Sequence, residues 1–366
     1  MFIFAPAMKT QTTNFTPGPS QLFYTVADHM RIAFREGIPS LSHRSKRAET
    51  IYKDIVEGLS ELLDLPPSYH IFFTGSATEI WERIIQNLVR KNSFHLVNGS
   101  FSKRFYEVAN QLHKVADKAE VLPGQGFSEN ITLPPDTELM AITHNETSTG
   151  VAIPLELIHK IKESAPQTLI AVDAVSSLPF PAFDYTKIDS AFFSVQKGFG
   201  LPAGLGVWMV NEACLQKAGQ LLAEGASIGS YHSLPSLRDN AVKNQTPETP
   251  NLLGMYLLSK VIADMNRIGI KRIRSETEYK AAILYQVLEN HNMLQPFVRD
   301  KRLQSKTVIV ADTGEHTGKL TKRLLDLGLQ PGAGYGPGKN SQLRFANFPT
   351  HSRENFEHLV DCLSTY

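Results

Sequence analysis

The sequence contains few cysteines and almost no excess charge. Only Cys214 and Cys362 occur among 366 residues, so they supply neither a disulfide framework nor a thiolate metal site, and a reducing compartment is expected. A formal net charge of +1 gives no electrostatic reason to expect binding to nucleic acid or to a membrane surface. These absences predict a cytoplasmic protein that holds no metal and has neither nucleic acid nor membrane as a partner.

Long apolar runs are also missing. No run approaches the roughly 18 residues that a membrane-spanning helix needs. Residues 1–9 begin with a few apolar side chains but lack the basic segment and the apolar core of a signal peptide. With 42% hydrophobic and 20% charged residues, the composition predicts an ordinary packed fold, and 366 residues are enough for two domains.

Short apolar runs alternate with amphipathic stretches over the first two-thirds of the chain. The runs are typical of buried strands, and the stretch before Arg90 has apolar residues at helical spacing on one face. Strand and helix in alternation predict an α/β fold, in which helices cover a mostly parallel sheet. The predicted strands are Ile71–Phe73, Phe94–Val97, Leu139–Thr143, Leu169–Val172, Ala191–Gln196 and Gly206–Val210.

The pattern changes near residue 245. A loop rich in helix breakers, residues 245–250, precedes a long helical region at about Leu252–Asn290, and the remainder has the pattern of a smaller α+β unit. Strands are predicted there at Thr307–Val310 and Gln342–Ala346. We predict a large domain of residues 16–260 and a small C-terminal domain of residues 261–366, which also includes residues 1–15.

Lys197 is the most informative residue. It lies between two predicted buried strands and opens a glycine-rich turn, residues 198–204. An ammonium group there is costly unless it is paired or neutral, and an imine with a carbonyl cofactor is one use for such a lysine. Asp173 follows another apolar strand. A lysine for the imine and an aspartate for the pyridinium nitrogen are the two protein groups that pyridoxal phosphate (PLP) most needs.

Each of these features also has an ordinary explanation. Residues 74–78 join a strand to a helix and can cradle a phosphate, but Ser76 or Thr78 can also simply cap the helix. The string Ser194–Lys197 has the spacing of a serine acyl-enzyme motif, although strand-like residues precede it. His43 and Arg44 belong to a cationic segment that is either an anion site or a solvated helix start.

The order of these segments along the chain favours the functional interpretation. The loop at residues 74–78, the segment Asn145–Thr147, Asp173 and Lys197 each follow a predicted strand. Because the carboxyl ends of parallel strands meet at one edge of a sheet, these four groups are able to converge.

These segments together resemble the class V, fold type I, PLP-dependent aminotransferases, and most of all the phosphoserine aminotransferases among them. That fold has a mostly parallel, seven-stranded sheet between helices in a large domain, and a smaller α+β domain. The likeness covers nearly the whole chain. It is carried by Asn14–Pro19, Ser42–Lys46, Asn145–Thr147, Asp173, Gln196–Lys197 and Leu343–Asn347.

The resemblance implies a role for each matching residue. Lys197 forms the imine with PLP and carries a proton, and Asp173 keeps the pyridine nitrogen protonated so that the ring accepts electrons. Thr246 and Thr249 reach the phosphate of the PLP in a neighbouring subunit, which implies a homodimer. The remaining implied contacts with PLP are Ser76, Ala77 and Gln196 to the phosphate, Phe101 stacked on the ring, and Thr147 beside the ring hydroxyl.

The substrate residues follow from the same resemblance. Arg344 binds the substrate α-carboxylate through two parallel hydrogen bonds, a geometry that lysine does not match. His43, Arg44 and Lys339 are assigned to a distal phosphate. The implied reaction is transamination from glutamate to 3-phosphohydroxypyruvate, giving O-phosphoserine and 2-oxoglutarate, with amino acids and 2-oxo acids as partners.

The sequence departs from the family pattern in two places. Pro337 and Gly338 stand where the family usually has a His-Arg pair, and Gln245 replaces the usual Asn. A serine– or alanine–glyoxylate type of aminotransferase on the same scaffold therefore remains an alternative. A cysteine desulfurase fits less well, because neither cysteine lies in an obvious active-site loop. A non-enzymic binding protein with this fold is disfavoured by the intact Lys197 and Asp173.

Overall fold

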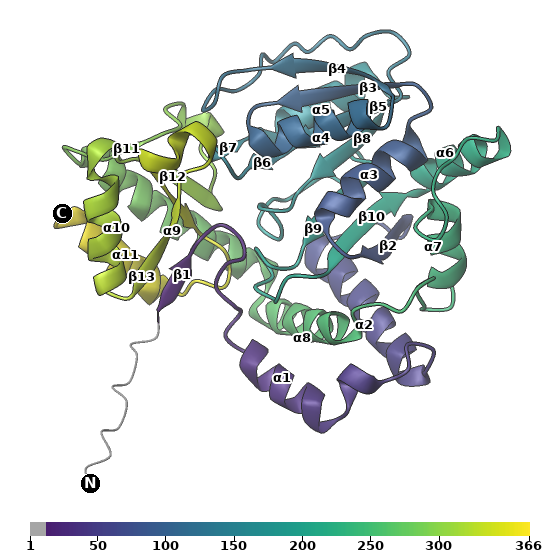
Figure 1. Ribbon diagram of the computed structural model, residues 1–366, viewed down its shortest axis with the longest axis horizontal. Helices are drawn as coiled ribbons and strands as arrows, with labels where there is room; N and C mark the ends of the chain where they lie inside the picture. Colours follow the sequence, from purple (N-terminus) through teal and green to yellow (C-terminus); the bar gives the residue numbers. More distant parts are fainter. Residues whose placement is uncertain (1–11) are drawn as a thin grey trace.

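The computed structural model describes residues 12–366. The predictions that residues 1–9 are no signal peptide and that residues 1–11 join the small domain lie outside the described residues. Within them, no helix combines the length and the apolar character that crossing a membrane requires. Figure 1 shows a large sheet with helices on both faces, beside a smaller sheet with its own helices.

The large sheet has seven strands in the order β2-β10-β9-β8-β5-β3-β4. All neighbouring pairs are parallel except those made by β10, which runs antiparallel to both β2 and β9. The predicted α/β fold with a mostly parallel sheet is therefore confirmed. The strands are β2 (Tyr69–Thr74), β3 (Asn92–Val97), β4 (Val115–Glu120), β5 (Leu139–Thr143), β8 (Leu169–Asp173), β9 (Ser190–Ser194) and β10 (Gly206–Asn211).

Helices bury both faces of this sheet, because side chains alternate between the two faces along each strand. Phe193 and Val207 pack on one face with α1, α2, α5 and α8, whereas Phe192 and Trp208 pack on the other with α3, α4, α6 and α7. These helices are α1 (Val26–Arg35), α2 (Lys46–Leu63), α3 (Ala77–Leu88), α4 (Ser100–Gln111), α5 (Leu155–Ser164), α6 (Glu212–Ala223), α7 (Leu234–Ala241) and α8 (Leu252–Ile268).

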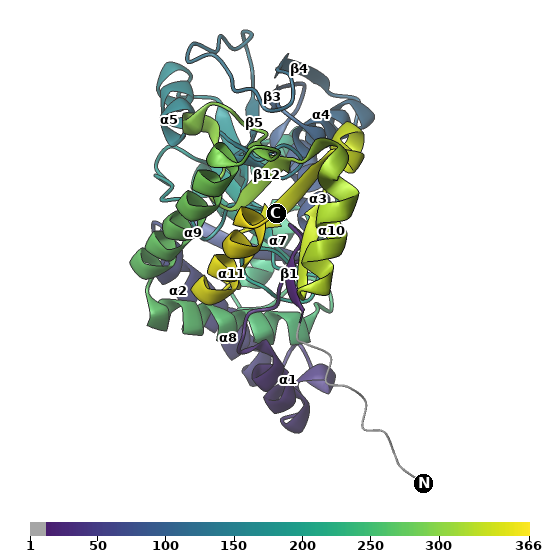
Figure 2. The same cartoon turned by 90° about the vertical axis from the view of Figure 1, so that its left-hand side faces the viewer.

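The second sheet has five strands in the order β1-β13-β14-β12-β11. It brings β1 (Thr13–Phe15), from the start of the described chain, alongside β13 (Leu329–Ala333). The other strands are β11 (Gln295–Pro296), β12 (Val308–Asp312) and β14 (Gln342–Ala346). Side chains of α9 (Ile270–Asn290), α10 (Thr317–Asp326) and α11 (Arg353–Ser364) form its core, and Figure 2 shows these three helices in front of it.

The helical region expected at 252–290 consists of two helices. Gly269 separates α8 from α9, because its φ of +88° lies outside the helical range and favours glycine. Helix α8 packs against the large sheet's helices, and α9 packs in the core of the second sheet. The division into domains at residues 260 and 261 stays a proposal.

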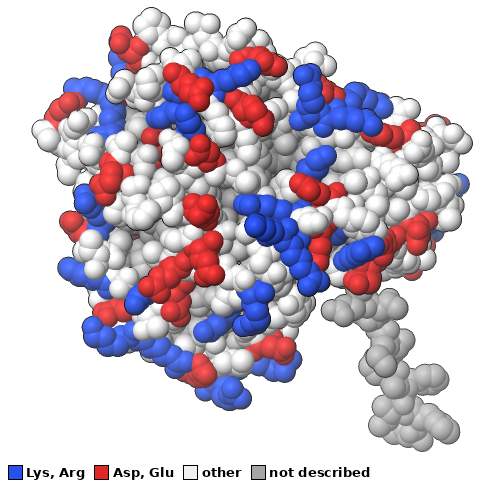
Figure 3. All heavy atoms as spheres, turned by 180° about the vertical axis from the view of Figure 1, so that it is seen from behind, with Lys and Arg blue, Asp and Glu red and all other residues white. Residues whose placement is uncertain are grey.

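The surface and the cysteines carry little further information. Lys and Arg side chains lie beside Asp and Glu across most of the face seen in Figure 3. Cys214 and Cys362 are both buried free thiols.

Candidate active site

A cavity of about 210 Å³ lies at the carboxyl ends of β5, β8 and β9. Parallel strands direct their following loops to this edge, which is where ligands bind in such sheets. Arg344 on β14 also lines the cavity, so both sheets contribute to it. Of the residues assigned from the sequence, the cavity is lined by Ala77, Phe101, Thr147, Asp173, Gln196, Lys197 and Arg344.

Lys197 follows β9 and is 8% exposed. Its Nζ donates to Oγ1 of Thr147 at 3.0 Å and lies 5.2 Å from the centre of the Phe101 ring. Burial lowers the pKa of Lys197 to about 8, although the negative charges of Asp173 and Glu146 act in the opposite direction. A large fraction of this amine is therefore neutral near pH 8, which is the form that attacks a carbonyl carbon.

Gly18 closes the cavity over this lysine. A Cβ atom at Gly18 would lie 2.8 Å from Cε of Lys197, and the φ of +142° also disfavours other residues. The N-terminal segment is held there because Ser20 N–H donates to the carbonyl of Gln196 at 3.0 Å. The Lys197 side chain is thereby confined to the cavity.

Asp173 ends β8 and is buried beside two N–H donors. The indole Nε1–H of Trp81 donates to Oδ2 at 2.9 Å, and the backbone N–H of Val175 donates to Oδ1 at 3.0 Å. Burial raises the pKa of Asp173 to about 6, while these two hydrogen bonds and the charge of Lys197 favour the carboxylate. A cationic ring nitrogen in the cavity would add to that preference. Trp81 belongs to the helical stretch predicted before Arg90, but its hydrogen bond to Asp173 was not predicted.

Replacing Trp81 with Phe is expected to weaken cofactor binding, because it removes the indole donor and keeps the aromatic bulk. Without this hydrogen bond the pKa of Asp173 rises above about 6, so the carboxylate is lost at higher pH than in the wild type. One charge-assisted hydrogen bond contributes about 1.5–3 kcal/mol, or about 10- to 150-fold in Kd. Absorbance titrations with PLP between pH 6 and 8 measure the loss, which we expect to grow as the pH falls.

Trp208 provides a matched control for this experiment. It is the second tryptophan of the chain, it is fully buried, and its Nε1–H donates to Oγ of Ser190 at 2.9 Å away from the cavity. Trp208→Phe should leave the affinity for PLP and its pH dependence unchanged. Equal affinities for Trp81→Phe and wild type across this pH range would contradict the role of Trp81.

A network of polar side chains surrounds Thr147 at the cavity. Thr147 donates from Oγ1 to Oγ of Ser176 at 2.9 Å, and Ser176 also accepts from Nδ2 of Asn145 at 2.8 Å. Oγ1 of Thr143 and Oδ1 of Asn145 are buried and lack a hydrogen-bond partner among residues 12–366. Both residues line the cavity, so these atoms are available to a bound polar molecule.

The segment between β2 and α3 places a helix N-terminus at the cavity. Ser76 is the N-cap, and its Oγ accepts from Glu79 N–H at 3.2 Å, which is the capping explanation offered for this segment. Ala77 N–H donates to Oγ of Ser194 at 2.8 Å. Ala77 and Gln196 line the cavity, and Oε1 of Gln196 is a further buried acceptor without a partner in the described chain. The phosphate contacts assigned to these residues stay predictions.

Arg344 enters the cavity from the second sheet. Its Nε donates to the carbonyl of Ala333 at 2.7 Å, and its Nη1 donates to the carbonyl of Thr147 at 3.1 Å. The guanidinium lies 5.4 Å from the centre of the Tyr335 ring, and that ring lies 5.2 Å from the ring of Phe101. Tyr335 therefore connects the arginine to the aromatic residue beside Lys197. It was not singled out in the sequence.

Six assigned residues do not line this cavity: His43, Arg44, Ser76, Thr246, Thr249 and Lys339. Arg44 is exposed, and its Nη1 donates to Oε1 of Gln245 at 2.7 Å and to the carbonyl of Thr246 at 2.9 Å. Thr246 is buried, whereas Thr249 and Lys339 are exposed. Within one copy of the chain, Arg44 therefore supports the loop at residues 245–249. The roles assigned to these six residues remain predictions.

That loop is tied to the start of α3 by His232. Its Nδ1 contacts Oε1 of Glu79, and its Nε2 lies 3.2 Å from Oε2 of Glu248, close enough for an ion pair but outside hydrogen-bond angles. Burial opposes the charged imidazole, yet the two carboxylates prevail and raise the pKa of His232 to about 9. The protonated histidine thus joins the 245–249 loop to the segment at the cavity.

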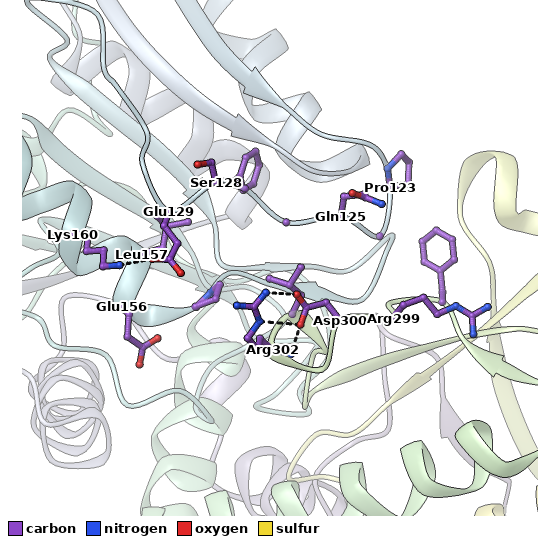
Figure 4. A pocket seen from close by; sticks show the side chains of 16 residues that line it. Pro123, Gln125, Ser128, Glu129, Glu156, Leu157, Lys160, Arg299, Asp300 and Arg302 are labelled. Atoms are coloured by element: carbon purple, nitrogen blue, oxygen red, sulfur yellow. Dashed lines mark hydrogen bonds and ion pairs between the residues drawn. The ribbon is translucent and has the colours of Figure 1, made fainter.

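A larger cavity, of about 940 Å³, lies elsewhere (Figure 4). It is formed by residues 123–129, the start of α5 and residues 297–303. Four of the charged side chains labelled in Figure 4 form ion pairs, Lys160 with Glu129 and Arg302 with Asp300, each at 2.8 Å. This cavity lacks an unpaired buried lysine or aspartate, so the smaller cavity is the candidate site.

Comparison with known proteins agrees with this geometry. Residues 12–328 match the family described as Aminotransferase class-V. The chain belongs to the class V aminotransferases. A phosphoserine aminotransferase of Rhodococcus jostii (strain RHA1) is 30% identical over 323 residues, which are 87% of this chain and 86% of that protein. The predicted PLP-dependent aminotransferase is confirmed by this membership.

Solved structures of class V and related aminotransferases have the same fold. A phosphoserine aminotransferase from Cytophaga hutchinsonii is 50% identical, with a TM-score of 0.96, and the likeness covers 98% of this chain and 99% of that one. An aspartate aminotransferase from Thermus thermophilus is 21% identical with a TM-score of 0.84, covering 96% of this chain and 97% of that one. The predicted fold type I is thereby confirmed.

The residues of the cavity fit the cofactor that the family implies. A buried amine and a buried carboxylate line it together, as an aldehyde and a pyridine nitrogen require. The partnerless acceptors on Thr143, Asn145 and Gln196 add polar positions around them. In the part of the chain that the structure describes, no group of three His, Cys, Asp or Glu side chains is placed to hold a metal ion.

Proposed function

We propose that this chain transfers an amino group from glutamate to 3-phosphohydroxypyruvate, giving O-phosphoserine and 2-oxoglutarate. The observation that carries the proposal is the likeness, at 50% identity over 98% of the chain, to a protein named phosphoserine aminotransferase. The phosphoserine aminotransferase of Rhodococcus jostii supports it at 30% identity. Arg344 and Lys197 in one cavity supply the chemistry that any amino acid substrate of this family needs.

PLP, when bound, supplies an aldehyde for the imine and a ring that accepts electrons from the substrate's Cα. In this proposal the neutral amine of Lys197 would hold the cofactor through that aldehyde and would carry a proton to and from the substrate's Cα. Asp173 keeps a charged ring nitrogen in place, held by the N–H groups of Trp81 and Val175. Thr147 orients the amine, and the aromatic ring of Phe101 excludes water from it.

Cofactor phosphate binding is assigned to the N-terminus of α3. Ser76, Ala77 and Gln196 are the proposed contacts, and the positive end of the helix dipole favours an anion there. Thr246 and Thr249 do not line this chain's own cavity, in keeping with a contact to the phosphate in a second copy. We accordingly propose a cytoplasmic homodimer with shared sites.

Substrate recognition is assigned to Arg344 for the α-carboxylate. Two of its N–H groups donate to backbone carbonyls, which orients the guanidinium, and the others remain for the substrate. His43, Arg44 and Lys339 are the proposed cations for the distal phosphate. The replacement of the usual His-Arg pair by Pro337 and Gly338 keeps the serine– or alanine–glyoxylate type as the alternative.

Kinetics of Arg44→Ala and Arg344→Ala with phosphoserine, serine and alanine test the proposal. One lost charge-assisted contact costs about 1.5–3 kcal/mol, so Arg44→Ala should lower kcat/KM for phosphoserine about 10- to 150-fold and that for alanine little. Arg344→Ala should lower kcat/KM for every amino acid, because all share the α-carboxylate.

Arg47→Ala is the matched control, since this neighbouring exposed arginine pairs with Glu36. This variant should leave kcat/KM unchanged for all three substrates. The structure also gives Arg44 a second role in supporting the 245–249 loop, which would affect all substrates equally. If Arg44→Ala does so, and the wild type uses serine or alanine as well as phosphoserine, the glyoxylate type replaces the phosphoserine proposal.

A further inference from the structure

Glu146, on β6 (Asn145–Glu146), is a fully buried carboxylate without a cationic partner. Among the ion pairs of residues 12–366, none includes it. Burying an uncompensated carboxylate is among the most costly arrangements in a protein. Glu146 is also next in sequence to Thr147, whose hydroxyl contacts the amine of Lys197. The buried carboxylate therefore lies close to the reacting group.

Five hydrogen-bond donors surround this carboxylate. The backbone N–H groups of Phe101, Ser102 and Ser148 donate to it at 3.3, 2.9 and 3.1 Å. The hydroxyls of Ser102 and Ser148 donate at 2.9 and 2.6 Å. Phe101 and Ser102 belong to the first turn of α4, whose positive dipole end also stabilises a negative charge. These donors satisfy the carboxylate as an anion, since none of them needs it to carry a proton.

The backbone at Gly99, just before α4, lies too close to Glu146 for any larger residue. A Cβ atom at Gly99 would lie 2.4 Å from Cγ of Glu146 and 2.6 Å from Oγ of Ser148. The backbone at the start of α4 is therefore packed directly against the Glu146 side chain, and α4 and β6 are in contact. Glu146 fixes where α4 begins.

Two groups that contact Lys197 depend on this arrangement. Phe101 donates its N–H to Glu146, and its ring lies 5.2 Å from Nζ of Lys197. Thr147 is the next residue on the chain, and its hydroxyl accepts from Nζ at 3.0 Å. Phe101 is thus bonded directly to the carboxylate, and Thr147 is its covalent neighbour on the chain.

We propose that Glu146 is a positioning residue, which holds the first turn of α4 and with it Phe101 beside Lys197, and whose buried negative charge adds to that of Asp173 around the amine. This proposal rests on the proposed function of Lys197 as the reacting amine. The charged and titratable groups around Lys197 are Asp173 on β8, Glu146 on β6, Arg344 on β14 and Tyr335 next to it. Asp173 and Glu146 favour the ammonium, whereas Arg344 and burial oppose it.

The test measures the pH dependence of Lys197 acetylation by acetic anhydride in the full-length chain prepared without cofactor. Peptide mass spectrometry separates the lysines, and the midpoint of the rate against pH reports the pKa of each amine. Glu146→Gln should lower the midpoint of Lys197 by on the order of one pH unit, because the charge that favours the ammonium is removed. This readout needs no transaminase activity, so it stands or fails separately from the proposed reaction.

Lys280 is the internal reference in the same digest. It is also buried, burial lowers its pKa to about 8, and its Nζ donates to the carbonyls of Phe348 and His351, remote from β6. Its midpoint should not move. Asp189→Asn removes another buried carboxylate, which is paired with Lys162 at 2.7 Å. Asp189 precedes β9, whereas Lys197 follows it, so this variant should leave the midpoint of Lys197 unchanged.

An unchanged midpoint of Lys197 in folded Glu146→Gln overturns the proposal, and so does an equal shift in Asp189→Asn. If Glu146→Gln does not fold, as judged by circular dichroism, the same measurement on Ser148→Ala tests the proposal. This variant keeps the charge of Glu146 but removes one hydrogen bond that compensates it, so the charge acts more strongly on Lys197 and the midpoint of Lys197 should rise. A midpoint that stays or falls in Ser148→Ala then overturns the proposal.

Discussion

Lys197→Ala is expected to abolish transamination while the folded chain still binds PLP without a covalent bond. Lys197 is the only lysine that lines the cavity among residues 12–366, so no other amine is placed to react with the cofactor. We expect kcat to fall by at least about 10⁴-fold, equivalent to about 5.5 kcal/mol. Stopped assays of glutamate turnover at saturating PLP measure this loss.

Borohydride reduction of the wild type, followed by peptide mapping, identifies the lysine that carries the cofactor. Lys280 is a stringent internal control, because it is as buried as Lys197 and burial likewise lowers its pKa to about 8. It lies in the core of the second sheet and does not line the cavity. A reduced label on Lys280, or on any lysine other than Lys197, would disprove the assignment.

Asp173→Asn has the second largest expected effect. An amide cannot supply the negative charge that holds a protonated ring nitrogen, so the rate should fall by on the order of 10² or more, about 2.7 kcal/mol. Both oxygens of Asp173 accept N–H bonds, and the amide can accept at only one of them. Weaker PLP binding is therefore expected too, and rates should be compared in protein that is fully loaded with PLP.

Asp264→Asn is the matched control for a buried carboxylate. Asp264 lies on α8 and pairs with His29 and Arg267 at 2.8 and 2.9 Å, away from the cavity. This variant should lose stability and keep its rate per loaded site. A near wild-type rate in PLP-loaded Asp173→Asn would show that the charge of Asp173 is not needed for catalysis.

The interior strands were predictable because they are apolar on both faces. Phe192 and Phe193 illustrate this, since one packs on each face of the sheet and a continuous apolar run results. Strand β4 was not recognised, because it lies at the sheet edge and most of its side chains, in Val115–Glu120, are exposed. The break at Gly269 was also missed, since a glycine within a helical pattern gives only a weak signal.

Convergence of the site was predictable, but the residues that support it were not. The order of Asp173 and Lys197 after parallel strands indicated one edge of the sheet. The bond from Trp81 to Asp173 joins residues 92 positions apart, and it depends on how α3 lies on β8. The segment Asn145–Thr147 was singled out, but the burial of Glu146 was not predicted, because a glutamate is almost never fully buried unless it is paired.

The closure of the cavity by Gly18 makes the enclosed amine depend on both sheets. Gly18 is held over Lys197 by a segment whose strand β1 pairs with β13, Thr13 opposite Leu329. Strand β1 precedes the strands of the large sheet in sequence, whereas β13 and Arg344 on β14 follow them. The pocket around the amine is therefore complete only when segments from before and after the large sheet have come together.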